Sequence, residues 1–195
     1  MIEYLAGRIA DNQIGKGRIA GYDRAIYQYG YVLLMETGMN IFLSVVLGVI
    51  CHTLPEVLLF LLFFIPLRSY AGGWHMAHAW QCILVTNITI LCVTLAAAFL
   101  SRYLSAGFLL GADILACAVI CIMSPIDTEA KPLEEDEKII YRKKARIICI
   151  SELFINMIIS LLSWNRFLCV ISMSHCILVL SLILEKNNKK KKCRQ

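Results

Sequence analysis

Charged side chains are scarce in this sequence of 195 residues. Only 17% are Asp, Glu, Lys or Arg, whereas 59% are hydrophobic, and the mean hydropathy is +0.70. A soluble domain is nearer half apolar and roughly a quarter charged. The composition therefore excludes an ordinary soluble domain and predicts one compact integral membrane domain over residues 1–195.

Three motifs that would define other classes of protein are also missing. No Walker motif is present, which argues against ATP-driven transport by this chain alone. The nine cysteines show no regular loop spacing, so we expect reduced, mostly structural thiols rather than a disulfide framework. The first 31 residues contain seven charged side chains and no continuous apolar core, so we expect insertion to begin at a retained internal helix.

Long apolar runs dominate the rest of the chain. Six are found, at about 30–50, 54–67, 80–100, 104–123, 147–163 and 167–184. A helix needs roughly 20 residues to cross a bilayer, so the short second run crosses only if the bilayer thins or flanking residues join it. The sequence thus predicts an all-α polytopic membrane protein with about six transmembrane or re-entrant helices. A four-span alternative, with the second and third runs re-entrant, stays open.

The basic residues orient these spans. With the N-terminus inside, all but two of the 19 lysines and arginines (Arg102 and Arg166) lie on the inner side. The positive-inside rule therefore predicts cytoplasmic N- and C-termini. The cytoplasmic parts are then the segment 1–29, the loop after the second run, the loop 124–146 and the tail 185–195. The tail is polybasic and is expected to bind anionic lipid.

Two of the cytoplasmic segments show helical patterns. Ile2, Leu5 and Ile9 have the spacing of a short amphipathic helix within residues 1–21, which would lie on the inner leaflet. In the loop 124–146, Pro132 and several acids precede a basic stretch, which predicts a second helix. That helix is either a solvated loop element or a docking surface for a charged peptide.

The most reactive side chains fall in one short stretch, "RSYAGGWHMAHAWQC", from Arg68 to Cys82. Pro66 and the pair Gly72–Gly73 are expected to break any continuous helix. Glycine also lets a second backbone approach closely, as an extended peptide substrate would require, although a flexible loop between helices is the better explanation for the glycine pair taken alone. By the positive-inside rule this stretch lies at the cytoplasmic face.

Cys82 has two possible histidine partners. His75 is seven residues away, which is about 10.5 Å along a straight helix and too far for a hydrogen bond of about 3 Å. A bend, with a helix starting near Ala77 or His78, would bring them together and put Cys82 near a helix N-terminus, where a thiolate is favoured. His78, four residues away, reaches Cys82 without a bend. A zinc ion bound by His75, His78 and Cys82 would still need a fourth ligand, and the sequence offers no obvious one. We therefore predict no metal, and we also predict no cofactor.

A few polar residues interrupt the apolar runs. Ionisable groups in a bilayer are costly and are functional or paired by default. We favour hydrogen bonding between helices, while one carboxylate orienting His75 is the alternative. Gly107 and Gly111 form a GxxxG pattern that is compatible with a homodimer. The polar residues concerned are Glu36, Asn40, Asp113 and Glu152.

The stretch 68–82 resembles the hallmark of the AgrB (accessory gene regulator protein B) family, bacterial membrane cysteine endopeptidases of quorum sensing. That hallmark is an Arg, a small-Gly-Gly-x-His run, and a Cys seven residues after the His. "SPIDTEAKP" is similar to a second family signature, through Pro125, Asp127, Lys131 and Pro132. The residues that match the first are Arg68, Ala71, Gly72, Gly73, His75 and Cys82.

The resemblance implies a specific activity in the bacterial cytoplasmic membrane. The substrate would be an AgrD-like propeptide with an amphipathic leader, a signal segment and an acidic tail. Cys82 would be the nucleophile and His75 the base, releasing the tail and leaving a thioester that cyclises to a thiolactone or lactone. No nucleic-acid partner is expected. Residues that would bind substrate or shape the site are Arg68, Gly72, Gly73, Lys131, Lys143, Lys144 and Arg146.

Two other classes of function stay open from the residues alone. A peptide exporter or channel would also use several spans with buried carboxylates, but it would tolerate replacement of Cys82. A membrane protein that binds metal through histidine and cysteine would lose its metal on replacement of either histidine.

Overall fold

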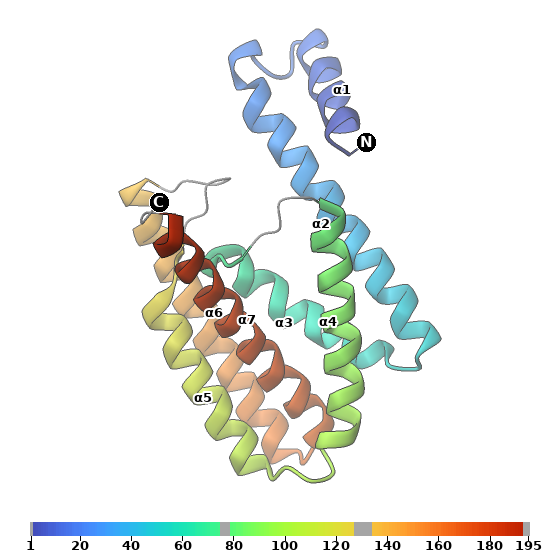
Figure 1. Cartoon of the computed structure of the whole chain (residues 1–195), viewed down its shortest axis with the longest axis vertical. Coiled ribbons are helices and arrows are strands. Elements are labelled where there is room, and N and C mark those ends of the chain that lie inside the picture. Colours follow the sequence, from blue (N-terminus) through green and yellow to red (C-terminus); the bar gives the residue numbers. More distant parts are fainter. Residues whose placement is uncertain (1, 75–78, 127–133, 193–195) are drawn as a thin grey trace.

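The computed structural model describes residues 2–74, 79–126 and 134–192 (Figure 1). Within these residues the chain is helical, with no β-strand, which confirms the predicted all-α class. The elements are α1 (Ile2–Gly15), the 3-10 turn η1 (Gly21–Asp23), α2 (Arg24–Ile50), α3 (Leu54–Ala71), α4 (Ala79–Leu100), α5 (Ala106–Met123), α6 (Glu135–Leu161) and α7 (Asn165–Lys192).

The predicted apolar runs correspond one by one to α2 to α7. In the described residues, five of these helices are long and apolar enough to cross a membrane, namely α2, α3, α4, α5 and α7. Helix α6 differs because residues 135–146 are rich in charge and only its second half is apolar. The protein is therefore polytopic. Which side of the membrane holds the termini stays a prediction.

Pro66 does not end a helix, contrary to the prediction. It lies inside α3, which continues to Ala71 before Gly72 ends it. Proline already has a helical φ angle, although it lacks the N–H donor and its ring crowds the carbonyl four residues earlier. Membrane helices tolerate it where nearby groups satisfy the freed carbonyl. The apolar run 54–67 is thereby extended to 18 residues, close to the length that a span requires.

The predicted loop helix and the fifth apolar run are one continuous helix, α6, of 27 residues. Its N-terminus is capped by Glu134 and Glu137, and the Glu134 amide donates to the Glu137 carboxylate at 3.2 Å. No proline or glycine separates the charged half from the apolar half, so nothing in the backbone stops the helix between them. Lys131 and Pro132 lie outside the described residues.

The helices run alternately up and down, and this brings three predicted cytoplasmic parts to one end (Figure 1). Gly72, after α3, forms a parallel backbone bridge with Ile126, after α5. The Trp74 amide donates a hydrogen bond to the hydroxyl of Ser181, in the middle third of α7. Buried apolar side chains of α3, α5 and α7 fill the middle of the bundle, among them Phe60, Leu67, Ile120, Leu168, Ile171 and Leu178.

Helix α1 folds back along the projecting N-terminal half of α2 (Figure 1). Its small residues Ala6, Gly7 and Ala10 are buried, and Asp11 accepts a 2.6 Å hydrogen bond from Arg24. The helix predicted within residues 1–21 is thus present. Leu5 stays exposed, and the position of α1 on the inner leaflet stays a prediction.

The GxxxG pair makes no close helix contact within this chain. A Cβ atom added at Gly107 or Gly111 would meet nothing within 4 Å among the neighbouring described atoms. Homodimer formation through this face stays a prediction.

Candidate functional site

Cys82 lies in the first turn of α4 as the structure describes it, and its side chain is half-buried. Helix α3 ends at Ala71, and Gly72 has a φ angle of +82°, so the chain turns sharply before α4 begins. The predicted break before Cys82 is therefore present. His75 and His78, its two possible partners, lie outside the described residues.

The Cys82 side chain borders a cavity of about 350 Å³ between α2, α3, α4 and the start of α6. This volume falls within the roughly 300–1,000 Å³ range that is usual for ligand pockets. Its polar lining includes Glu36, Arg68 and Tyr141, and Gly72, Pro125 and Ile126 line it as well. A second cavity of about 170 Å³ extends between α3, α4 and α7, and it shares Arg68 and Cys82 with the first.

Arg68 is held from two sides. Its guanidinium donates to the carbonyl of Trp74 at 2.7 Å and to the hydroxyl of Ser181 at 3.2 Å. It also stands over the Phe64 ring, 5.6 Å from the centroid, and it lines both cavities together with Cys82. Such fixed contacts distinguish this arginine from a solvated residue that only anchors the span at the membrane surface.

Ser181 fixes the start of the segment that leads to His75. Its hydroxyl accepts a 2.9 Å hydrogen bond from the Trp74 amide in addition to that from Arg68. A Cβ atom on Gly73 would stand 2.6 Å from the same hydroxyl oxygen, so only glycine fits there without a shift. Sequence reasoning missed Ser181, because a lone serine in an apolar run gives no signal of its partners.

Gly72 allows two connections of the bundle to touch. The Ile126 amide donates to the Ala71 carbonyl at 3.0 Å, and a Cβ atom on Gly72 would collide with the Ile126 carbonyl oxygen. The close backbone approach that was considered for a peptide substrate is therefore made at Gly72 by the chain itself. Pro125 precedes Ile126, and both line the larger cavity.

The polar residues within the apolar runs fall into two groups. Asn40 accepts a 3.1 Å bond from Asn87 of α4, and Asp113 and Glu152 both bond His175 of α7. For these three the favoured interpretation, hydrogen bonding between helices, is confirmed. Glu36 lines the cavity that contains Cys82, as Asn40 also does. His175 was not singled out from the sequence, because a lone histidine in an apolar run does not reveal its partners.

The predicted basic residues of α6 have different surroundings. Lys144 stands over the ring of Tyr70, 5.0 Å from the centroid, and Tyr70 lines the larger cavity. Arg146 donates to the carbonyl of Cys121 at 3.3 Å, and Lys143 is exposed. Among these three, Lys144 is the residue joined to the wall of the cavity.

The fold and the site define a polytopic α-helical membrane protein with a half-buried cysteine at the wall of a cavity near one end of its bundle. The profile of the family Accessory gene regulator B matches residues 2–183, and the chain belongs to that family. It is 26% identical to AgrB-like protein 2 of Clostridium perfringens strain 13, over 85% of this chain and 80% of that protein. An AgrB-like protein of C. perfringens strain SM101 is equally similar, with the same coverage. No solved structure matches.

Family membership supports a general role in the processing of an autoinducer propeptide. It also agrees with a multi-pass membrane location, which the five long apolar helices indicate independently.

Proposed function

We propose that this protein is a membrane cysteine endopeptidase that removes the C-terminal tail of an AgrD-like propeptide. The observation that carries the proposal is the position of Cys82, which borders the same cavity as Arg68 and Glu36 and lies in the first turn of α4. A helix N-terminus and a nearby guanidinium both favour the thiolate form of a cysteine. The thiolate is the form that attacks a carbonyl.

The proposed reaction has two steps. His75 takes the thiol proton of Cys82, the thiolate attacks the peptide carbonyl, and the same proton passes to the leaving amine of the tail. The C–N bond breaks and a thioester to Cys82 remains. A thiol or hydroxyl within the signal segment then attacks this thioester, closes the ring and returns a proton to Cys82. The apolar wall of the cavity supports this second step, because exclusion of water protects a thioester from hydrolysis.

Glu36 is the carboxylate best suited to orient the base. Asp113 and Glu152, the two other intramembrane acids considered for this role, both bond His175. Glu36 lines the cavity of Cys82. A carboxylate that bonds the second nitrogen of an imidazole fixes its tautomer and orientation. We therefore assign Glu36 to the proposed site as a positioning residue.

Basic residues of α6 would receive the acidic tail of the propeptide. Lys144 stands over Tyr70, which lines the cavity, and Lys143 and Arg146 lie on the same helix. Opposite charges at the mouth of a cleft raise the local concentration of a charged substrate. Lys131, in the loop before α6, would extend this basic region.

The test uses purified protein in liposomes with the cognate propeptide, and mass spectrometry of the released tail. Cys82→Ala and His75→Ala should abolish release, whereas His78→Ala should retain it. A matched control is Cys92→Ala, an exposed thiol of the same helix, which should cleave like the wild type. Continued cleavage by Cys82→Ala would reject the protease assignment and favour an exporter or channel.

A further inference from the structure

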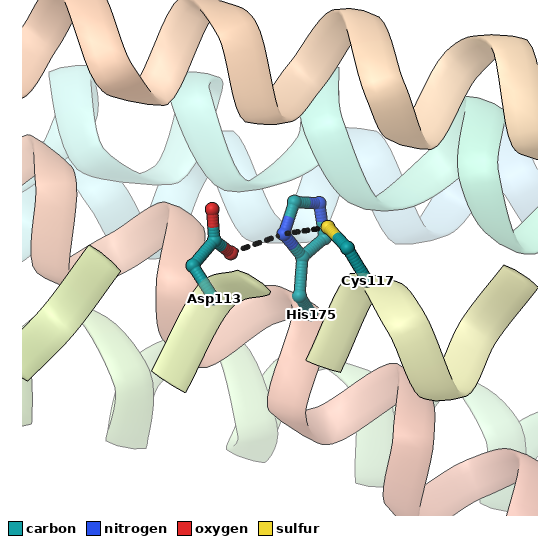
Figure 2. Close-up of side chains that lie close together, drawn as sticks. All are labelled: Asp113, Cys117 and His175. Atoms are coloured by element: carbon teal, nitrogen blue, oxygen red, sulfur yellow. Dashed lines mark hydrogen bonds and ion pairs between the residues drawn. The ribbon is translucent and has the colours of Figure 1, made fainter. Parts of the chain in front are cut away.

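A second group of reactive side chains lies buried between α5, α6 and α7, away from the residues that line the Cys82 cavities. Asp113 and Cys117 are four residues apart, so they share one face of α5. Figure 2 shows both side chains directed at the imidazole of His175 from α7. All three are buried, and their potential ligand atoms lie within 4.8 Å of one another.

A second thiol lies beside this group. Cys149 of α6 is buried and packs against Cys117, since the Cys117 thiol contacts the Cys149 carbonyl at 3.9 Å and the Cys149 thiol contacts the Cys117 carbonyl at 3.8 Å. Among the described residues, its sulfur does not belong to the set of donors that all lie within 4.8 Å of one another. One oxygen, one nitrogen and one sulfur donor thus converge from α5 and α7.

The imidazole is already oriented as in metal centres. Its Nδ1 faces Asp113 at 2.6 Å and Cys117 at 3.8 Å. Its Nε2 is bound by Glu152 of α6 at 2.9 Å. A histidine that ligates a metal almost always donates its other nitrogen to a carboxylate or carbonyl. Glu152 has this position, outside the three donors.

The group also contains two carboxylates but a single side chain that can carry a positive charge, the imidazole of His175. Among the described residues, Asp113 and Glu152 both form their ion pair with the same imidazole, that of His175. Asn156 donates to Asp113 at 2.8 Å, but its own buried carbonyl oxygen has no hydrogen-bond partner in the described structure. Buried charge that is not balanced is costly in a bilayer. A divalent cation that replaces the proton on Nδ1 and the proton on the Cys117 thiol adds no further charge to the group, and it gives the oxygen, nitrogen and sulfur donors one shared partner.

We infer that Asp113, Cys117 and His175 form a zinc site that ties α5 and α7 together, with water as the fourth ligand. Thiolate, imidazole and carboxylate are the donors that Zn²⁺ prefers, and three protein ligands with one open position is an established zinc arrangement. Binding replaces the protons on Nδ1 and on the Cys117 thiol, so two protons leave as the metal enters. Two N or O ligands of a zinc ion lie about 3.3 Å apart. The Asp113 oxygen and the His175 Nδ1 atom, which are 2.6 Å apart without metal, would therefore move apart by less than about 1 Å.

The test measures zinc by mass spectrometry in the full-length protein, purified in detergent with zinc and desalted. About one zinc per chain is expected. Cys117→Ser should bind zinc at least tenfold more weakly, and Glu152→Gln about tenfold to a hundredfold more weakly, as for other outer partners of metal ligands. Cobalt in place of zinc should show a thiolate-to-metal charge-transfer band that Cys117→Ser weakens.

Two control variants separate this site from other thiols. Cys169→Ser changes a thiol that is equally buried on α7, and Cys82→Ser removes the thiol of the rival set with His75 and His78. Both should keep their zinc. A folded wild-type protein without zinc, or equal zinc in Cys117→Ser and wild type, would overturn the inference and leave an imidazolium between two carboxylates as the description of the cluster.

Discussion

The Ser181 hydroxyl of α7 holds the Trp74 amide at 2.9 Å and the Arg68 guanidinium at 3.2 Å. Trp74 directly precedes His75, so α7 fixes the chain at the point where the proposed base begins. Loss of one hydrogen bond to a charged group costs about 1.5–3 kcal/mol. Ser181→Ala should therefore lower the maximal cleavage rate about tenfold to a hundredfold, with little change in KM, measured by release of the tail in liposomes.

Ser174→Ala is the matched control for this prediction. Ser174 is buried on the same helix, but its hydroxyl bonds a carbonyl of α7 itself, that of Ile171. It should cleave like the wild type. A similar loss of rate in both variants would mean that Ser181 supports the packing of α7 rather than the position of the loop.

Much of the fold could be predicted from the sequence, because apolar runs of membrane length are a strong and local signal. The predicted run 80–100 corresponds closely to α4, Ala79–Leu100. Pro66 gave a wrong break, because a single proline in a membrane helix is tolerated when its surroundings compensate. Ser181 and His175 could not be found, since their importance depends on contacts with residues 107 and 62 positions away.

Gly72→Ala should prevent the connections after α3 and α5 from touching. Its φ of +82° is unfavourable for alanine, and the added Cβ would collide with the Ile126 carbonyl oxygen. The backbone conformation of Gly72, with φ +82° and ψ −157°, alone costs roughly 1–3 kcal/mol for other residues. We expect unfolding in detergent at clearly lower temperature and loss of cleavage. Gly111→Ala, which meets nothing within 4 Å, should unfold at or slightly above the wild-type temperature.

Lys144→Glu should slow cleavage of a propeptide with an acidic tail, because it places a negative charge beside Tyr70 at the cavity wall. We expect KM to rise several-fold at low salt, and the difference from wild type to shrink as salt screens the charges. Arg18→Glu, an exposed charge in the segment before α2, is the control and should leave KM unchanged. An unchanged KM in Lys144→Glu would contradict a role of α6 in tail binding.

Low pH should release α1 from α2. The hydrogen bond from Arg24 holds the pKa of Asp11 below its ordinary value of 3.8. A depressed pKa means that the pairing stabilises the docked helix above pH about 4 and is lost as the pH falls through the folded-state pKa. Hydrogen exchange of the α1 amides should therefore accelerate below pH 4 relative to α5. Asp11→Asn should show this faster exchange at neutral pH, and no difference there would refute the anchoring role.

Arg166 supports the opposite end of the bundle. Its guanidinium lies 2.6 Å from the carboxylate of Glu56, whose side chain is only 5% exposed while that of Arg166 is 44% exposed. Removal of one partner of a buried ion pair costs about 3–5 kcal/mol, and the exposure of Arg166 reduces this to roughly 1–3 kcal/mol, because water screens the pair. Arg166→Leu should lower the free energy of unfolding by that amount. Glu56→Gln with Arg166→Leu should recover most of it, because no buried charge is then left alone. Equal losses in the single and double variants would show that the ion pair does not stabilise the contact between α3 and α7.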